Sequence, residues 1–168
     1  EIIVVNDGST DSTVEKMISH YEMKEVKKAV RKQVETKPIL RVFQSTLLSN
    51  LYMVDKENGG KADALNVGVN FSHYPYICSL DGDSILEHDA FLKVMKPIID
   101  SNGEVIASGG SIRIANGCEI QNGHMLKVGL SDHPLVVMQI IEYLRAFLMG
   151  RIGLSRHNLL LIISGAFG

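Results

Sequence analysis

The sequence carries little net charge. Its 168 residues include 17 Lys and Arg against 19 Asp and Glu, which gives a net charge of −2 at neutral pH. A chain so close to neutral has no global basic field that would attract nucleic acid or an anionic membrane surface. We therefore expect no nucleic-acid partner.

Cysteine and long apolar runs are also scarce. The two cysteines, Cys78 and Cys118, form no C-x-x-C pair and no metal-ligand spacing, which fits a reducing compartment. No signal peptide opens the chain, and no run reaches the ~20 apolar residues of a membrane span. The closest approach, residues 135–154, is interrupted by charged side chains. We expect membrane contact only through segments outside this chain.

Both ends of the chain look cut. Residues 1–5 begin inside a β-branched run, and residues 164–168 follow directly on another apolar run. The length is enough to bury one proper core. We therefore predict a single, partial domain over residues 1–168.

Residues 76–84 are the stretch around which the sequence is organised. A mostly apolar run ends in Asp81 and Asp83, with Gly82 between them. The run predicts a buried strand of a parallel sheet, whose carboxyl end is where such sheets bind ligands. Two carboxylates there repel each other unless a cation lies between them, which favours a divalent ion shared with substrate phosphate. The alternative is structural, with Asp83 or Ser84 opening a helix.

Polar side chains also follow the first predicted strand, residues 2–5. The polar turn 6–13 leads into a helix with Val14 and Met17 on one face. Asp7, at the strand end, could accept hydrogen bonds from a nucleobase or ribose. The alternative roles are turn formation and N-capping, which we favour for Asp11 over Asp7.

A third polar segment, residues 58–68, opens a predicted helix. Gly59 and Gly60 precede Lys61, so backbone N–H groups and a cation could bind a phosphate together. The G-x-x-x-x-G-K-[ST] spacing of a P-loop is absent. The alternative is a turn with a surface lysine.

The remaining elements follow from periodicity and turn residues. We predict a solvated amphipathic helix over residues 22–37, because charged residues alternate there with small apolar ones, acidic residues offset the basic ones, and no aromatic side chains interleave them. His124 and His133 show no ligand spacing and are expected on the surface. The other predicted strands are at 39–43, 51–54, 105–108, 111–114 and 159–163. Helices are predicted at 89–99 and 135–150, and the second carries a stripe of Met and aromatic side chains that we expect to be buried. A polar turn is predicted at 115–123.

The order of three segments, 6–11, 60–66 and 80–84, resembles that of family 2 glycosyltransferases of the GT-A fold. Residues 142–147 and 163–168 look like later segments of its processive branch, which includes chitin, hyaluronan and other N-acetylglucosamine-transferring synthases. The resemblance implies an α/β, Rossmann-like GT-A fold with a mostly parallel central sheet flanked by helices, incomplete in this chain.

The resemblance also implies roles for individual residues. Asp7 would hydrogen-bond the uracil of a UDP-sugar, and Lys61 would lie near its diphosphate. Asp81 would face the ribose and diphosphate, and Asp83 would coordinate Mg²⁺ or Mn²⁺. The place where donor sugar and acceptor meet would be lined by Ser164, Gly165 and Ala166.

The implied reaction is metal-dependent, inverting transfer of a hexosyl or N-acetylhexosaminyl group to a saccharide or lipid-linked acceptor at the cytoplasmic face of a membrane. The family's catalytic base would fall after Gly168 and its first strand before Glu1, so we expect donor binding but no turnover from this chain. Two other enzyme classes use strand-end carboxylates such as Asp81 and Asp83: nucleotidyltransferases and phosphohydrolases of the haloacid dehalogenase type. A non-catalytic binding module is a further alternative.

Overall fold

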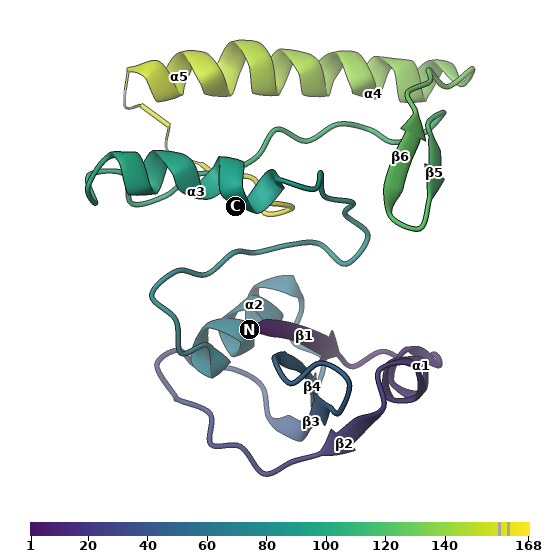
Figure 1. The fold of residues 1–168 in the computed structure, drawn as a ribbon, viewed down its shortest axis with the longest axis vertical. Coiled ribbons are helices and arrows are strands. Elements are labelled where there is room, and N and C mark those ends of the chain that lie inside the picture. The colour runs from purple at the N-terminus through teal and green to yellow at the C-terminus, as the bar shows by residue number, and fades with distance from the viewer. Residues whose placement is uncertain (158, 161) are drawn as a thin grey trace. The chain divides into compact units, whose positions relative to one another are not determined.

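The fold is described from a computed structural model that covers residues 1–157, 159–160 and 162–168. The chain divides into two compact units, Glu1–Ile77 and Cys78–Gly168, and each is described by itself (Figure 1). The single partial domain over residues 1–168 stays a prediction.

The first unit is built on a four-stranded sheet. Its strands are β1 (Ile2–Asp7), β2 (Met23–Glu25), β3 (Ile39–Ser45) and β4 (Leu51–Lys56), in the order β1-β4-β3-β2. β1 pairs with β4 in parallel, whereas β3 pairs antiparallel with both β4 and β2. The sheet is therefore mixed, with one parallel pair where the resemblance implied a mostly parallel arrangement.

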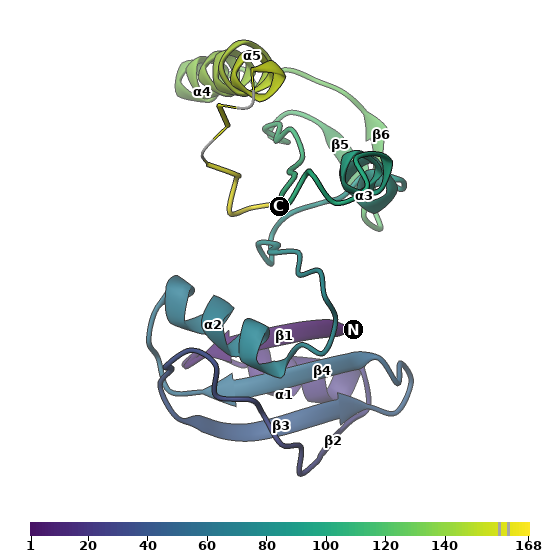
Figure 2. The same cartoon turned by 90° about the vertical axis from the view of Figure 1, so that its left-hand side faces the viewer.

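Two helices cover the sheet, α1 (Thr13–His20) and α2 (Lys61–Phe71) (Figure 2). Successive side chains of a strand point to opposite faces, and β4 shows this clearly. Met53 packs in a cluster with Val14 of α1, and its neighbour Val54 packs in a second cluster with Phe71 of α2. Met53 and Val54 are both completely buried, so the sheet has a core on each face. The strands predicted at 2–5, 39–43 and 51–54 and the helices predicted after the polar segments 6–13 and 58–60 are confirmed.

The amphipathic helix predicted at residues 22–37 does not form. The segment contributes the short strand β2 and then runs irregularly. Its backbone is tied to α2 by Asn70, whose side-chain Oδ1 accepts hydrogen bonds from the N–H groups of Gln33 and Val34, both at 3.0 Å. The Asn70 amide also donates to the Val34 carbonyl at 2.7 Å. Tertiary hydrogen bonds therefore replace those that a helix would have supplied.

Replacing Asn70 with alanine should lower the free energy of unfolding by about 2 kcal/mol, because the buried amide satisfies backbone groups that would lose their partners. Asn66→Ala on the same helix is the matched control, since the Asn66 side chain makes no hydrogen bond with the described residues. It should change stability by less than about 0.5 kcal/mol. Equal effects of the two variants in urea denaturation would contradict this role of Asn70.

The second unit contains helices and a hairpin. α3 (Ala90–Asp100) confirms the helix predicted at 89–99, and a continuous helical stretch is formed by α4 (Pro134–Leu144), η1 (Arg145–Arg151) and α5 (Ile152–Arg156). β5 (Glu119–Gln121) and β6 (His124–Lys127) pair antiparallel. Positive φ angles at Asn122 and Gly123, 50° and 77°, make the tight turn between them. This hairpin replaces most of the polar turn predicted there.

Four predicted strands are absent from the described residues. Residues 76–79, 105–108 and 111–114 lie outside any strand, and so do the described residues of 159–163; residue 161 itself lies outside the described residues. Tyr76 and Ile77 are 53% and 51% exposed, so the apolar run at 76–80 is not a buried strand. An apolar run predicts a strand only where a neighbouring strand supplies a hydrogen-bond ladder.

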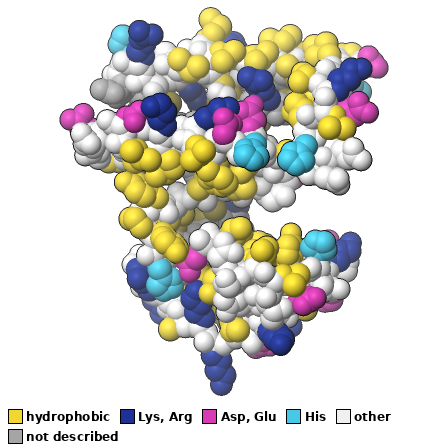
Figure 3. All heavy atoms as spheres, in the orientation of Figure 1, with side chains coloured by type: hydrophobic (Ala, Val, Ile, Leu, Met, Phe, Trp, Pro, Cys, Tyr) yellow, Lys and Arg dark blue, Asp and Glu magenta, His cyan; other side chains and the backbone are white. Residues whose placement is uncertain are grey.

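The long helical stretch leaves large apolar side chains exposed, and hydrophobic atoms gather over α4 and α5 in Figure 3. Among the described residues of this stretch only Phe147 is buried, so the Met and aromatic stripe was wrongly predicted as core. On the same stretch Glu142 forms an ion pair with Arg145 at 2.8 Å. Within the part of the chain that the structure describes, no helix combines the length and the apolar character needed to cross a membrane.

Candidate functional site

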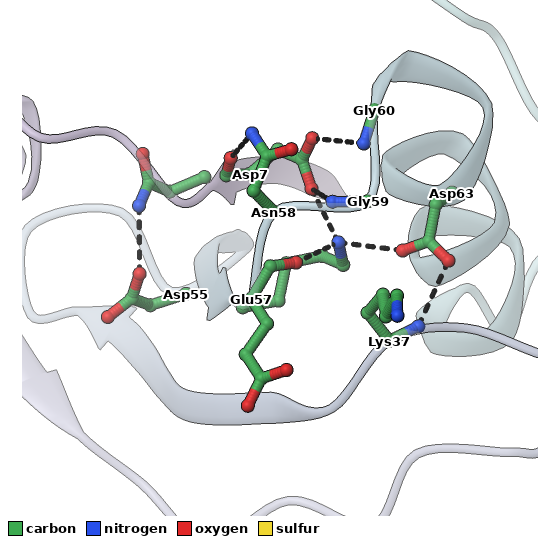
Figure 4. A network of polar contacts seen from close by, with 10 residues as sticks. Asp7, Lys37, Asp55, Glu57, Asn58, Gly59, Gly60 and Asp63 are labelled. Atoms are coloured by element: carbon green, nitrogen blue, oxygen red, sulfur yellow. Dashed lines mark hydrogen bonds and ion pairs between the residues drawn. The ribbon is translucent and has the colours of Figure 1, made fainter.

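Asp7 ends β1, and its carboxylate is bound by the loop that opens α2 (Figure 4). The backbone N–H of Gly59 donates to Oδ1 at 2.9 Å, and that of Gly60 donates to Oδ2 at 2.7 Å. The Asn58 side chain also donates to the Asp7 carbonyl at 2.8 Å. The N–H groups of Gly59 and Gly60, predicted to bind a phosphate, therefore donate to a carboxylate of the same chain.

The two glycines are required by this close approach. Gly60 has a φ of 86°, a conformation that side chains rarely adopt. A Cβ atom at Gly59 would lie 2.7 Å from Cγ of Asp63. Lys61 is the first residue of α2 and is exposed. Its predicted contact with a diphosphate stays a prediction.

Lys56, the last residue of β4, lies beneath this loop with its side chain completely buried. Its ammonium group donates to Asp7 Oδ1 at 2.5 Å and forms an ion pair with Oδ2 of Asp63 at 2.6 Å. The carbonyl of Glu57 accepts a further hydrogen bond from it. The sequence analysis missed Lys56. The available signal was a lysine that continues a buried apolar strand, where a charge requires partners.

The contacts among Asp7, Lys56 and Asp63 favour the charged form of each side chain. Desolvation acts to raise the pKa of Asp7, but the hydrogen bonds from Lys56, Gly59 and Gly60 outweigh it and lower that pKa. The hydrogen bond from Lys56 likewise lowers the pKa of Asp63. Desolvation acts to lower the pKa of Lys56, and its bonds to Asp63 and Asp7 raise it overall. The three groups are therefore ionised at neutral pH.

A second polar group lies one residue earlier along the same two strands. Asn6 is opposite Asp55 in the parallel pair, and its amide donates to the Asp55 carboxylate at 2.8 Å. Arg41 donates two hydrogen bonds to the other oxygen, at 3.1 and 2.7 Å. Asn6 and Asp55 are both buried. An amide at position 6 therefore avoids a second buried carboxylate beside Asp55.

In the second unit, Asp81 and Asp83 lie in a turn rather than at a strand end. The Ser84 N–H donates to the Asp81 carbonyl at 3.0 Å. Residues 85–89 separate this turn from α3, whose N-cap is Asp89, so the alternative in which Asp83 or Ser84 opens the helix is wrong.

The turn is held by the far end of the chain. Leu80 forms an isolated antiparallel bridge with Phe167, flanked by hydrogen bonds between the backbones of Ser79 and Gly168 at 2.8 and 3.3 Å. The Asp81 N–H donates to the Ala166 carbonyl at 3.4 Å, and Ser79 Oγ donates to that of Gly165 at 3.2 Å. The structure thus brings together two predicted site segments that the sequence separates widely.

Packing around Phe167 fixes this arrangement. Its ring is buried, meets Phe91 of α3 edge to face at 5.6 Å, and fills the space that a Cβ at Gly110 would occupy. The Gly110 N–H donates to the Phe167 carbonyl at 3.2 Å. The Gly109-Gly110 pair therefore permits a close backbone approach.

Asp83 is the residue assigned to a metal ion. Its side chain is exposed and forms no hydrogen bond or ion pair with the described residues. An available carboxylate suits Mg²⁺ or Mn²⁺, since such ions use one or two protein carboxylates together with waters and substrate phosphates. Among the residues that the structure describes, no group of three or more His, Cys, Asp and Glu side chains could hold a metal ion by itself. The donor set therefore fits an ion shared with a phosphate-bearing substrate.

Comparison with known proteins identifies the family. The profile of glycosyl transferase family 2 matches residues 33–131. A poly-beta-1,6-N-acetyl-D-glucosamine synthase from Staphylococcus aureus (strain COL) is 35% identical over 91 residues, 54% of this chain and 16% of that protein. A synthase of the same name from Staphylococcus epidermidis is 33% identical over 121 residues, 71% of this chain and 23% of that protein.

The chain thus matches less than a quarter of the length of either synthase. No solved structure gives a significant match. The family profile covers more than half of the chain, including the Gly59–Lys61 loop and the turn at Asp81–Asp83. The chain belongs to glycosyl transferase family 2, and its strands and helices form an incomplete, Rossmann-like GT-A fold.

Proposed function

We propose that this chain supplies the donor-binding part of a glycosyltransferase that moves a hexosyl or N-acetylhexosaminyl group from a UDP-sugar to a saccharide or lipid-linked acceptor. The observation that carries the proposal is the turn at Asp81–Asp83, which exposes the Asp83 carboxylate and is held by hydrogen bonds against the small-residue segment that ends in Ala166. Family membership and the printed names of the two synthases support a sugar-polymer product.

Each predicted residue has a chemical task in this proposal. Asp7, kept ionised by its hydrogen bonds, would accept a hydrogen bond from the uracil N–H. Lys61 would attract the diphosphate, and Asp81 would contact the ribose and diphosphate. Ser164, Gly165 and Ala166, with small side chains, would leave room for the donor sugar and acceptor.

The transfer would invert the anomeric carbon. The acceptor oxygen forms the new bond to this carbon while the bond to the diphosphate breaks, and UDP leaves with the electron pair. Asp83 would hold Mg²⁺ or Mn²⁺, which when bound neutralises charge on the departing diphosphate. The acceptor hydroxyl must give its proton to a base, and we assign that role to no residue of this chain. Location at the cytoplasmic face of a membrane is part of the same proposal.

Calorimetry of UDP binding tests the proposal. In the presence of Mn²⁺, the chain should bind UDP at least about tenfold more tightly than ADP, a difference of ~1.4 kcal/mol in binding free energy. The preference follows from the ring N–H that uracil offers to the Asp7 carboxylate, since the adenine of a nucleotide has no ring N–H. Equal affinity for the two nucleotides, or no binding of either, would contradict a UDP-sugar site. Release of phosphate from a phosphomonoester, abolished by Asp81→Asn, would favour the phosphohydrolase alternative instead.

A further inference from the structure

Lys56 is a completely buried cation at the point where β4 ends. Removing an ammonium group from water is costly unless hydrogen bonds and opposite charges replace the water. Here the ammonium donates hydrogen bonds to a carboxylate oxygen of Asp7 and to the carbonyl of Glu57, and it forms an ion pair with a carboxylate oxygen of Asp63 at 2.6 Å. These three oxygens replace the water around the ammonium and hold Lys56 inside the protein.

The two carboxylates come from different elements. Asp7 ends β1, and Asp63 lies in the first turn of α2, where its other oxygen accepts a hydrogen bond from the Lys37 N–H at 3.0 Å. One ammonium group thus joins β1, β4 and α2 (Figure 4). The position of the Asp7 carboxylate is consequently fixed by a group that lies 49 residues away in the sequence.

The hydrogen bonds also determine what Asp7 can still do. A carboxylate offers about four acceptor positions. Lys56 and Gly59 donate to Oδ1, and Gly60 donates to Oδ2. One acceptor position stays open on Oδ2, and the Asp7 side chain keeps 20% of its surface exposed. An ionised Asp7 held in this way can accept an N–H from outside but cannot donate one.

We infer that Lys56 is a positioning residue of the donor site, holding the Asp7 carboxylate ionised and oriented so that its open Oδ2 position accepts an N–H of the donor nucleotide. This inference rests on the proposed function, because the nucleotide is the donor proposed above. Two charged groups face Asp7, the Lys56 ammonium from β4 and the Asp63 carboxylate from α2. Their charges are opposite. Removing the ammonium should therefore raise the titration midpoint of Asp7, and removing the carboxylate should not raise it.

The first arm of the test measures the Asp7 carboxyl directly by carbon-13 NMR, from neutral to acidic pH. In Lys56→Met the titration midpoint of Asp7 should move upward, because the attractive charge is lost. In Asp63→Asn it should stay or move downward, because a like charge is lost while Lys56 remains. A purely structural role for Lys56, holding α2 against the sheet, would make both variants shift Asp7 in the same direction, and that result would overturn the inference.

The second arm measures UDP affinity by calorimetry with the same variants. The Lys56→Met variant should bind UDP at least about tenfold more weakly at neutral pH, a loss of ~1.4 kcal/mol in binding free energy. The ratio of parent to variant affinity should grow as the pH falls toward 5, since only the variant protonates Asp7 there. A ratio that stays constant with pH would overturn the role of Lys56. If the parent chain binds no UDP, the proposed function fails, and the NMR titration still decides whether Lys56 fixes the charge of Asp7.

A measurement on the parent chain keeps the inference testable if Lys56→Met does not fold. The nitrogen-15 resonance of the Lys56 ammonium should shift with the same midpoint as the Asp7 carboxyl, because the two groups share a hydrogen bond. An ammonium resonance that does not respond when Asp7 takes up its proton would overturn the inference.

Discussion

Substituting Asp83 with alanine should remove the part of UDP binding that depends on Mn²⁺, an expected loss of at least about tenfold in affinity. The reason is that an ion shared between protein and diphosphate loses its assigned protein carboxylate. Calorimetry with Mn²⁺ and with EDTA separates this effect from direct contacts of the protein with UDP. In EDTA the variant and the parent should bind UDP equally.

The fold should not change in this variant, because Asp83 is exposed and has no hydrogen bond or ion pair with the described residues. Asp132→Ala is the matched control, since Asp132 lies in the same unit, is exposed and equally has no such partner. It should leave UDP affinity unchanged. Unchanged affinity in Asp83→Ala as well would contradict the assignment of the metal ion to this carboxylate.

Replacing Lys56 with methionine should lower the free energy of unfolding of the first unit by about 3–5 kcal/mol. Methionine fills a similar volume, but it leaves Asp7 and Asp63 as two partly buried like charges without the cation between them. Folded domains are stable by only about 5–15 kcal/mol, so this loss is a large share of the total. Native-state hydrogen exchange measures it for each unit separately.

Lys96→Met is the matched control for stability. Lys96 pairs with Asp100 at 2.6 Å, as short as the bond from Lys56 to Asp63, but the Lys96 side chain is 72% exposed. Exposed pairs contribute less than about 1 kcal/mol. If both methionine variants cost the same, burial would not be the source of the Lys56 effect.

The pH dependence of the Lys56→Met effect follows from the pKa shifts. Asp7 and Asp63 have folded-state pKa values lowered from 3.8, so their contribution is present above that pH and is lost as the pH falls through the lowered values. Lys56 has a raised pKa, so its contribution is present below 10.5 and is lost as the pH rises through the raised value. The stability difference between parent and Lys56→Met should therefore be largest in the neutral range and shrink at strongly acidic pH.

Local sequence patterns were sufficient for one helix and three strands of the first unit, which carry a strong periodicity or composition. Val14 and Met17 repeat at helical spacing, and the runs that became β1, β3 and β4 are dense in strand-forming residues. A strand prediction was wrong where the composition suited a strand but no neighbouring strand was available to pair with it. The run at 76–80 has strand composition, yet only Leu80 finds a bridge partner, Phe167.

The predictions for residues 22–37 and for the β5–β6 hairpin differed from the structure for different reasons. Charged residues that alternate with small apolar ones, as in 22–37, suit a helix as well as an exposed loop. The loop forms because Asn70, distant in the sequence, accepts hydrogen bonds from backbone N–H groups of this segment. The hairpin had a local signal, since Asn122-Gly123 between short strands favours a tight turn. That signal is local and is sufficient to predict the turn from the sequence.

The sequence by itself determined which residue types occur at the ends of elements: Asp7 after a strand, Gly59 and Gly60 before a helix, and Asp81 and Asp83 after an apolar run. Those types limit the chemistry to hydrogen bonding, anion contact and cation binding. Only the tertiary structure decided which groups meet. It directed the Gly59 and Gly60 N–H groups to Asp7 and buried Lys56 between two carboxylates.

The same holds for the second unit, where Ser84 Oγ lies 3.5 Å from the carbonyl of Ala166, 82 residues further along the chain. The physical reason is that a hydrogen bond or ion pair depends on distance and burial, and these are properties of the folded backbone. Residue type sets what a side chain can bind, whereas packing of remote segments sets what it does bind.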